Sequence, residues 1–169
     1  LDPNPVKPEN NYNPKLPPAK PAEPGKIVIV DYPGSNEQEP GNMLLSFPAD
    51  RTLTATEELL LGNFLAVFAG DANTNLYKKF IDSKTREIDL GAQSVYGYVD
   101  DNMGQPVFFG INDISVSNLT TEKAALIRKM ILDELLRVAS FKDGSPELKE
   151  FNSRFKNNLT DTRRGLTKF

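Results

Sequence analysis

The distribution of proline is the feature that most limits how this 169-residue chain can fold. Eight of its 13 prolines fall within the first 25 residues, at positions 3, 5, 8, 14, 17, 18, 21 and 24. Because proline lacks a backbone N–H and fixes φ, helices and paired strands are both disfavoured there. We therefore predict an extended inter-domain linker over residues 1–25, with an unattached tail as the alternative. A single domain over residues 26–169 is expected to follow, and a first residue that is not methionine suggests a piece of a longer protein.

Two apolar runs at the start of this domain have the composition of β-strands. The first, Lys26–Tyr32, is a β-branched run, and the second, Met43–Phe47, ends at Pro48. Next, Thr54 and Glu57 have the spacing of a capping box, and apolar residues continue with helical periodicity until Gly70. We predict two strands followed by a largely buried helix.

The rest of the domain has a similar order of elements. Thr74 can cap a short helix that has one apolar face. Residues 94–99 and 107–114 form a predicted antiparallel hairpin around the turn-forming residues 100–104. Residues 122–139 have an amphipathic helical pattern, and Ser145 precedes Pro146 as the N-cap of a last helix. The order β-β-α-α-β-β-α-α predicts an α+β fold, with helices packed on one face of an antiparallel-rich sheet.

The composition excludes several kinds of chemistry, because the chain contains neither histidine nor cysteine. Zinc, copper, haem and iron–sulfur sites draw mainly on these two residues, as do thiol nucleophiles and histidine-based general catalysis. A net charge of −3, with acids and bases interspersed, makes nucleic acid an unexpected partner. No apolar run is long enough to cross a bilayer, so we predict a soluble chain without a membrane partner, and its compartment stays undetermined.

Acidic side chains are the remaining candidates for a metal or catalytic site. They occur as three adjacent pairs, Glu57–Glu58, Asp100–Asp101 and Asp133–Glu134. None of the pairs has a third ligand or the spacing of a calcium loop, and no glycine-rich phosphate-binding motif is present. We therefore predict no catalytic residue, no metal ligand and no cofactor within this chain, and we assign the acid pairs to capping, turns and helix surfaces.

Two further groups could form binding surfaces. Basic residues gather near the C-terminus (Arg154, Lys156, Arg163, Arg164 and Lys168), where they could meet a partner or simply form a solvated helix face. Aromatic residues gather on the predicted hairpin (Tyr96, Tyr98, Phe108 and Phe109), where they could pack in the core or receive an extended peptide.

Three segments resemble a known family. They are Met43-Leu-Leu-Ser-Phe-Pro, the helix-forming run Glu57–Gly70, and Asn75-Leu-Tyr-Lys-Lys-Phe-Ile-Asp-Ser. Together they resemble the second domain of M16 (insulinase/pitrilysin-like) zinc metallopeptidases, and the Leu-Tyr-Lys wording is most similar to the presequence-protease branch. In that domain a strand is followed by a helix that ends in small residues, and then by a helix beginning with a Leu-Tyr/Phe-Lys motif. The resemblance extends from about Lys26 to Leu159.

The resemblance implies a LuxS/mitochondrial-processing-peptidase-like metallohydrolase fold and a division of labour between domains. In the family, zinc is held by the first domain through His-x-x-Glu-His, which this histidine-free chain cannot contain. It therefore implies a non-catalytic domain that supports the catalytic M16 domain, of the same chain or of a partner subunit, and walls a chamber for peptide substrates. The arginine by which the related fourth domain holds substrate would fall at Ile81, so no substrate-binding residue is carried over.

Two other functions remain open at this stage. The chain could be an inactive M16-like scaffold or partner-binding subunit, in which case the whole protein would lack a metal motif. It could instead be a free-standing enzyme that uses Asp/Glu chemistry.

Overall fold

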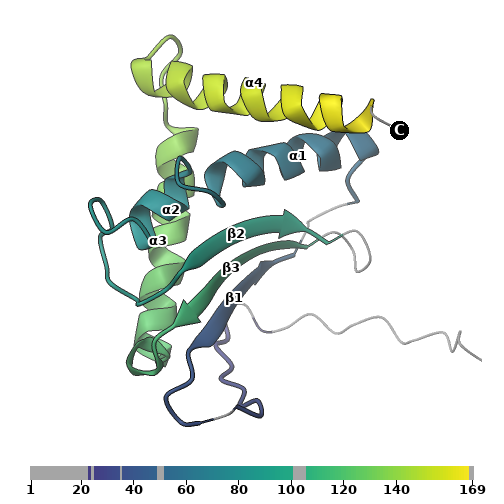
Figure 1. Ribbon diagram of the computed structural model, residues 1–169. Helices are drawn as coiled ribbons and strands as arrows, with labels where there is room; N and C mark the ends of the chain where they lie inside the picture. Colours follow the sequence, from purple (N-terminus) through teal and green to yellow (C-terminus); the bar gives the residue numbers. More distant parts are fainter. Residues whose placement is uncertain (1–22, 24, 35, 49–51, 101–105, 168–169) are drawn as a thin grey trace, which may run out of the picture.

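The computed structural model describes residues 23, 25–34, 36–48, 52–100 and 106–167 (Figure 1). Its elements are, in chain order, β1 (Gly41–Phe47), α1 (Ala55–Phe68), α2 (Asn75–Phe80), β2 (Ser94–Val99), β3 (Val107–Ile114), a single 3₁₀ turn (Val116–Asn118), α3 (Thr121–Ala139) and α4 (Pro146–Leu166). Three strands in one antiparallel sheet and four helices make up the described part, which confirms the predicted α+β class.

The sheet has the strand order β1-β3-β2, so the hairpin partner β3 occupies the centre. The predicted hairpin is confirmed, since β2 pairs with β3 from Ser94 opposite Asn112 to Val99 opposite Val107. The pairing of β1 with β3 is interrupted by a bulge, where Asp113 adopts a φ of 61° and donates its N–H to Asn42 Oδ1. The bulge allows Ile114 to join Phe109 and Ile111 on the same buried face, although the residue numbers change parity.

Helices cover one face of this sheet. Figure 1 shows α1 lying over the sheet and α4 lying outside α1, with the two helices antiparallel. Gly97 of β2 allows the close approach of α1, because a Cβ there would lie 3.2 Å from the Phe109 ring and 3.4 Å from Ala69. The core lies between the sheet and the helices, and its fully buried large side chains are Leu65, Phe68, Leu76, Phe80, Leu90, Phe109, Ile111, Ile114, Ile127 and Ile131.

Each helix begins at a capping side chain that the sequence identifies or allows. Thr54 accepts a hydrogen bond from the Glu57 N–H, and the Glu57 carboxylate accepts one from the Thr54 N–H, which confirms the capping box. Thr74 and Ser145 cap α2 and α4 as predicted, and Thr120 caps α3.

The predicted first strand, Lys26–Tyr32, is wrong. The segment is described but is not part of the sheet, and its side chains are exposed, with Val30 at 75%. A β-branched run favours extended backbone, but a strand also needs a partner for its N–H and C=O groups. The Ile27–Tyr32 N–H groups donate to no described backbone oxygen. Among the described residues, the hydrogen bond of this segment is the one that the Tyr32 hydroxyl donates to the Pro40 carbonyl. The observed order is therefore β-α-α-β-β-α-α.

The predicted linker lies almost wholly outside the described residues, as do residues 101–105 of the hairpin loop. No helix in the described part of the chain has the length and apolar character needed to span a membrane.

Candidate functional site

The face of the sheet turned away from the helices carries a row of aromatic rings. Because side chains alternate along a strand, Tyr96 and Tyr98 of β2 and Phe108 of β3 all point to this face. The rings stack one after another, with centroids 6.0 Å apart for Tyr96 and Tyr98 and 5.1 Å apart for Tyr98 and Phe108. Tyr96 remains 36% exposed and Tyr98 40% exposed, so this row is an accessible surface.

The strand positions around this row, within 42–46, 94–98 and 108–112, are uncharged, and the exposed Asp113 lies in the bulge near the end of β3. Leu44 of β1, 55% exposed, extends the apolar surface across the sheet, and Ser46 lies opposite Phe108. Gly110 is necessary for the arrangement, because a Cβ at that position would collide with the Tyr96 ring. The strand residues on this face, within 42–46, 94–98 and 108–112, are Asn42, Leu44, Ser46, Ser94, Tyr96, Tyr98, Phe108, Gly110 and Asn112, none of which is charged. We call this surface the open sheet face.

Four aromatic residues lie on the hairpin, as predicted from the sequence, but they do not share one face of the sheet. Phe109 points to the opposite side, is 2% exposed, and packs edge-to-face against Phe47 and Phe68. The three rings of the open sheet face can make apolar and stacking contacts with an extended peptide. The polar groups in this set of side chains are the hydroxyls of tyrosine and serine and the amides of asparagine.

A second feature is a polar network under α4, centred on a buried carboxylate. Glu134 of α3 is 5% exposed. Its carboxylate accepts hydrogen bonds from Asn75 Nδ2 at 2.7 Å and from two Arg137 nitrogens at 2.6 and 2.9 Å. Lys79 Nζ lies 3.6 Å from the same carboxylate and also binds Glu87 at 2.6 Å. The network therefore fastens α2 to α3.

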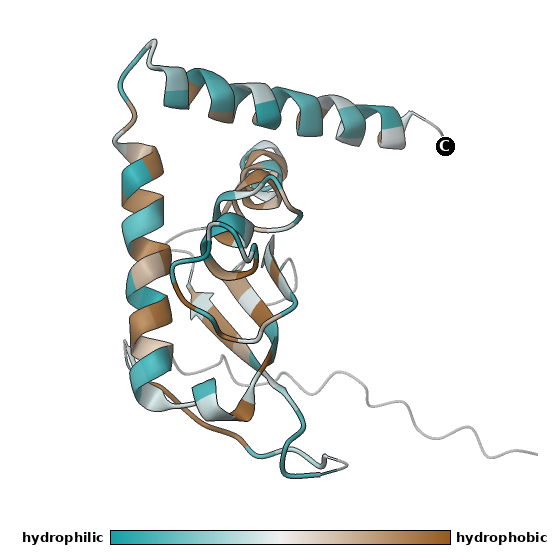
Figure 2. Ribbon diagram, turned by 60° about the vertical axis from the view of Figure 1, so that its left-hand side comes forward, coloured by the Kyte–Doolittle hydropathy of each residue, from teal (hydrophilic) through white to brown (hydrophobic). Residues whose placement is uncertain are grey.

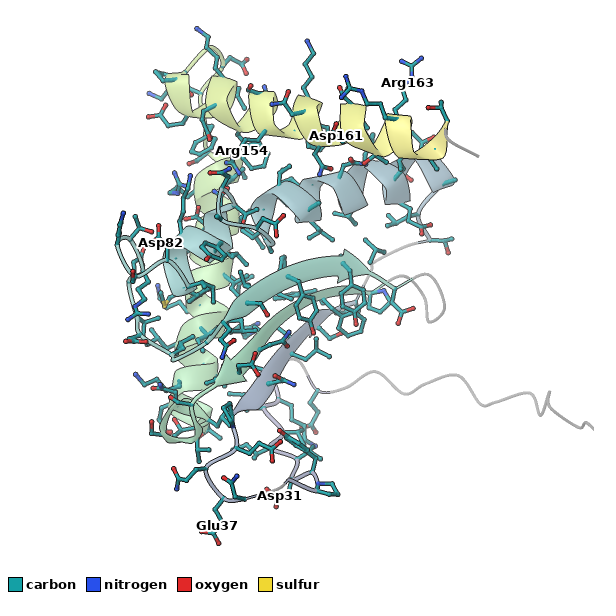
Figure 3. All side chains as sticks on the ribbon, in the orientation of Figure 1. Asp31, Glu37, Asp82, Arg154, Asp161 and Arg163 are labelled. Carbon is teal, nitrogen blue, oxygen red and sulfur yellow. The ribbon has the colours of Figure 1, made fainter. Side chains whose placement is uncertain are left out.

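Arg154 connects this network to α4 and α1. In Figure 3 its side chain points from α4 toward the body of the domain. Its guanidinium donates to Asn75 Oδ1 at 2.9 Å and to the Val67 carbonyl at 2.7 Å, and it forms an ion pair with Glu150. Arg154 thus satisfies a carbonyl of the last turn of α1, where a positive charge is favourable. One side chain holds three helices together.

Opposing effects set the pKa of Glu134. Burial raises the pKa of a carboxyl group, but the hydrogen bonds from Arg137 and Asn75, helped by the charges of Arg137 and Lys79, outweigh burial and lower the pKa of Glu134 below its ordinary value. Glu134 is therefore ionised at neutral pH, which is the state that its cationic neighbours require.

The surface over this network is hollowed by about 320 Å³. The hollow is lined by Asn75, Lys78, Lys79, Thr85, Glu87, Glu134, Arg137, Glu150 and Arg154. Each carboxylate in it already has a cationic partner, and in the described part of the chain no buried side-chain N or O atom lacks a hydrogen bond. The side chains that line the hollow therefore serve to connect the helices, and the hollow is the solvent-facing surface of this network.

The other predicted residues are dispersed. Glu57 caps α1, and Asp133 pairs with Lys129 on the outer side of α3. Within the described residues, no three acidic side chains come together as a metal site would require. Of the basic C-terminal residues, Arg154 turns inward, Lys156, Arg163 and Arg164 are exposed on α4, and Lys168 lies outside the described residues.

The role of Glu134 was not predicted from the sequence, although the position of Glu134 on α3 carries a signal for it. Glu134 lies three residues after Ile131 and seven after Ile127, on the apolar stripe of α3, whereas its neighbour Asp133 lies off that stripe. A carboxylate on the buried face of a helix requires a cationic or hydrogen-bonding partner. Asn75 could not be identified as that partner from the sequence because it is 59 residues away.

The structure is an α+β domain with two distinct surfaces. An aromatic sheet face is exposed on one side, and on the other side a buried ionic network connects the helices. Comparison with known proteins assigns it no further, because no protein-family model, no curated protein and no solved structure matches the chain.

Proposed function

We propose that this chain is a non-catalytic domain of an M16-type zinc metallopeptidase, in which it supports the catalytic domain and lines the chamber that receives peptide substrates. The open sheet face would form the chamber wall, and the polar network would hold the helices that support it. The observation that carries the proposal is the accessible row of Tyr96, Tyr98 and Phe108, which is surrounded by uncharged side chains.

The positions of the family-like segments support this assignment. Met43-Leu-Leu-Ser-Phe lies in β1, and α1 ends just before the small residues Ala69 and Gly70. The helix α2 begins with Asn75-Leu-Tyr-Lys. A strand, a helix and a second helix that begins with Leu-Tyr-Lys therefore follow one another in the order that the resemblance implies. In α2, Leu76 is buried in the core and Asn75 is in the network, so the motif acts through packing.

The apolar character of α1 also fits a domain that belongs to a larger assembly. Apolar side chains lie on nearly all sides of α1, and two of them, Leu59 and Leu60, are exposed in this chain. A helix of this kind is normally covered on more than one side. The surface around Leu59 and Leu60 is therefore a suitable contact for a catalytic domain.

Zinc would reside outside this chain. The chain has no histidine, and the described residues bring together no group of three acidic ligands. Zinc in the catalytic domain would activate the water that attacks the peptide bond. This chain's residues would contribute only contacts to the substrate: the three rings would pack against apolar side chains of an extended peptide, and the neutral face would impose no charge preference.

The proposal is tested by titrating the 169-residue chain with an unstructured peptide rich in Phe, Leu and Val, followed by backbone amide NMR. We expect shift changes confined to residues 94–98 and 108–112, with a dissociation constant of about 1 mM. Replacing Tyr96 and Tyr98 together by Ser should weaken binding about tenfold, since each aromatic contact contributes about 0.5–1.5 kcal/mol.

The matched control removes exposed apolar area elsewhere, through Tyr32→Ser and Leu136→Ser, and should leave the affinity unchanged. Shift changes spread over α3 and α4, or an equal loss in the control, would show that the open sheet face is not the binding surface.

An inactive M16-like scaffold is the second candidate, and the exposed Leu59 and Leu60 favour it equally, because they fit any protein partner. Metal analysis of the natural polypeptide that contains this chain separates the two. A peptidase should retain about one zinc per molecule, whereas a scaffold should retain none.

A further inference from the structure

The outer side of α4 carries a regular row of cations. Lys149, Lys156 and Arg163 are spaced seven residues apart, and Ser153 and Thr160 lie between them. All five side chains are exposed, and they lie opposite Phe151 and Arg154, which face the domain. We call these five residues the α4 ridge. Figure 3 shows Arg163 pointing away from the domain, and Figure 2 shows α4 as a largely hydrophilic helix.

The cations of the α4 ridge have no ion-pair partner among the described residues. Two carboxylates of α4 are paired with other cations, since Glu150 binds Arg154 and Asp161 binds Arg164. With a rise of 1.5 Å per residue, the three charges lie about 10.5 Å apart in a line of about 21 Å. Seven residues are nearly two full turns, so the charges stay on one side of the helix, and the small Ser153 and Thr160 leave room between them.

We propose that the α4 ridge docks an acidic α-helix of another protein or domain, with carboxylates at the same spacing of seven residues as the cations. A helix matches the cation spacing because both elements have the same rise and the same periodicity. Nucleic acid is disfavoured by the net charge of −3. A membrane surface is disfavoured because the α4 ridge contains no apolar side chain that could enter lipid. This surface is separate from the open sheet face and does not depend on the function proposed for it.

The test is a titration of the 169-residue chain, in low salt, with a synthetic Ala/Gln helix of about 20 residues that carries Glu at the seven-residue spacing. A second peptide of the same composition carries the same number of Glu residues distributed around the helix. Amide NMR should show shift changes along the outer side of α4, and the spaced peptide should bind more tightly than its isomer.

Two triple variants with the same charge change make the result specific. Lys149→Gln, Lys156→Gln and Arg163→Gln together should weaken binding about tenfold, because exposed ion pairs contribute at most about 1 kcal/mol each. The control triple, Lys84→Gln, Arg128→Gln and Lys142→Gln, should change it by less than about twofold.

Three outcomes would overturn the proposal: equal weakening in both triple variants, equal affinity for the two peptides, or binding to phosphatidylglycerol vesicles without binding to the spaced peptide.

Discussion

Replacement of Glu134 by Ala should destabilise the domain far more than replacement of an exposed acidic residue on the same helix. The change removes a carboxylate that accepts three hydrogen bonds, two of them from a guanidinium. Removing one partner of a buried ion pair costs about 3–5 kcal/mol, because the other partner keeps an uncompensated charge. Arg137 is 52% exposed and can regain water, but Asn75 and Lys79 are largely buried. We therefore expect a loss of about 2–3 kcal/mol in the free energy of unfolding.

Urea denaturation followed by circular dichroism measures this loss. With a slope of about 2 kcal/mol per molar urea, the midpoint should fall by about 1 M, with little change in slope. The adjacent variant Asp133→Ala is the matched control. Asp133 is exposed and pairs with Lys129 alone, so its loss should cost about 0.5 kcal/mol. Equal midpoints for the two variants would refute the account of Glu134 as the centre of a buried network.

Three further predictions concern Glu134, Gly110 and Phe68. The folded-state pKa of Glu134 lies below its ordinary value of 4.5. The stability difference between the wild type and Glu134→Gln should therefore be constant above about pH 5 and shrink as the pH falls through the folded-state pKa. Urea titrations from pH 7 to pH 3 would measure this difference, and a difference that grows in acid would contradict the assignment. Gly110→Ala should displace the Tyr96 ring, which would alter the Tyr96 ring signals in NMR and weaken peptide binding to the open sheet face, whereas unchanged ring signals would contradict the close approach. Phe68→Ala should lower the free energy of unfolding in urea by about 3–5 kcal/mol, and Leu44→Ser by less than about 0.5 kcal/mol, because Phe68 is fully buried and Leu44 is exposed. Comparable losses in the two variants would contradict the assignment of the core to the helix-covered face of the sheet.

Local signals in the sequence account for most of the helices and for the hairpin. Thr54, Thr74 and Ser145 begin helices because a short side-chain oxygen can satisfy a free N–H at a helix start, which depends only on near neighbours. The hairpin is similarly local, since β2 and β3 are joined by a short connection.

The features that sequence reasoning missed depend on distant partners. Lys26–Tyr32 has the composition of a strand but no strand beside it, and composition cannot report that absence. The open sheet face could be identified only once α1 was found to cover the opposite side and bury Phe109. The network under α4 depends on the contact of Asn75 with Arg154, which is 79 residues away. Charge pairing over such distances leaves no periodic pattern in the sequence.

The proposed division of labour is tested most directly by kinetics on the natural polypeptide that contains this chain. Hydrolysis of a long apolar peptide would be measured, together with zinc content, for the wild type and for the variant carrying Tyr96→Ser and Tyr98→Ser. We expect about one zinc in both proteins, and a KM about tenfold higher in the variant with kcat little changed. A wild-type polypeptide without zinc or hydrolysis, or a variant with unchanged KM, would contradict it.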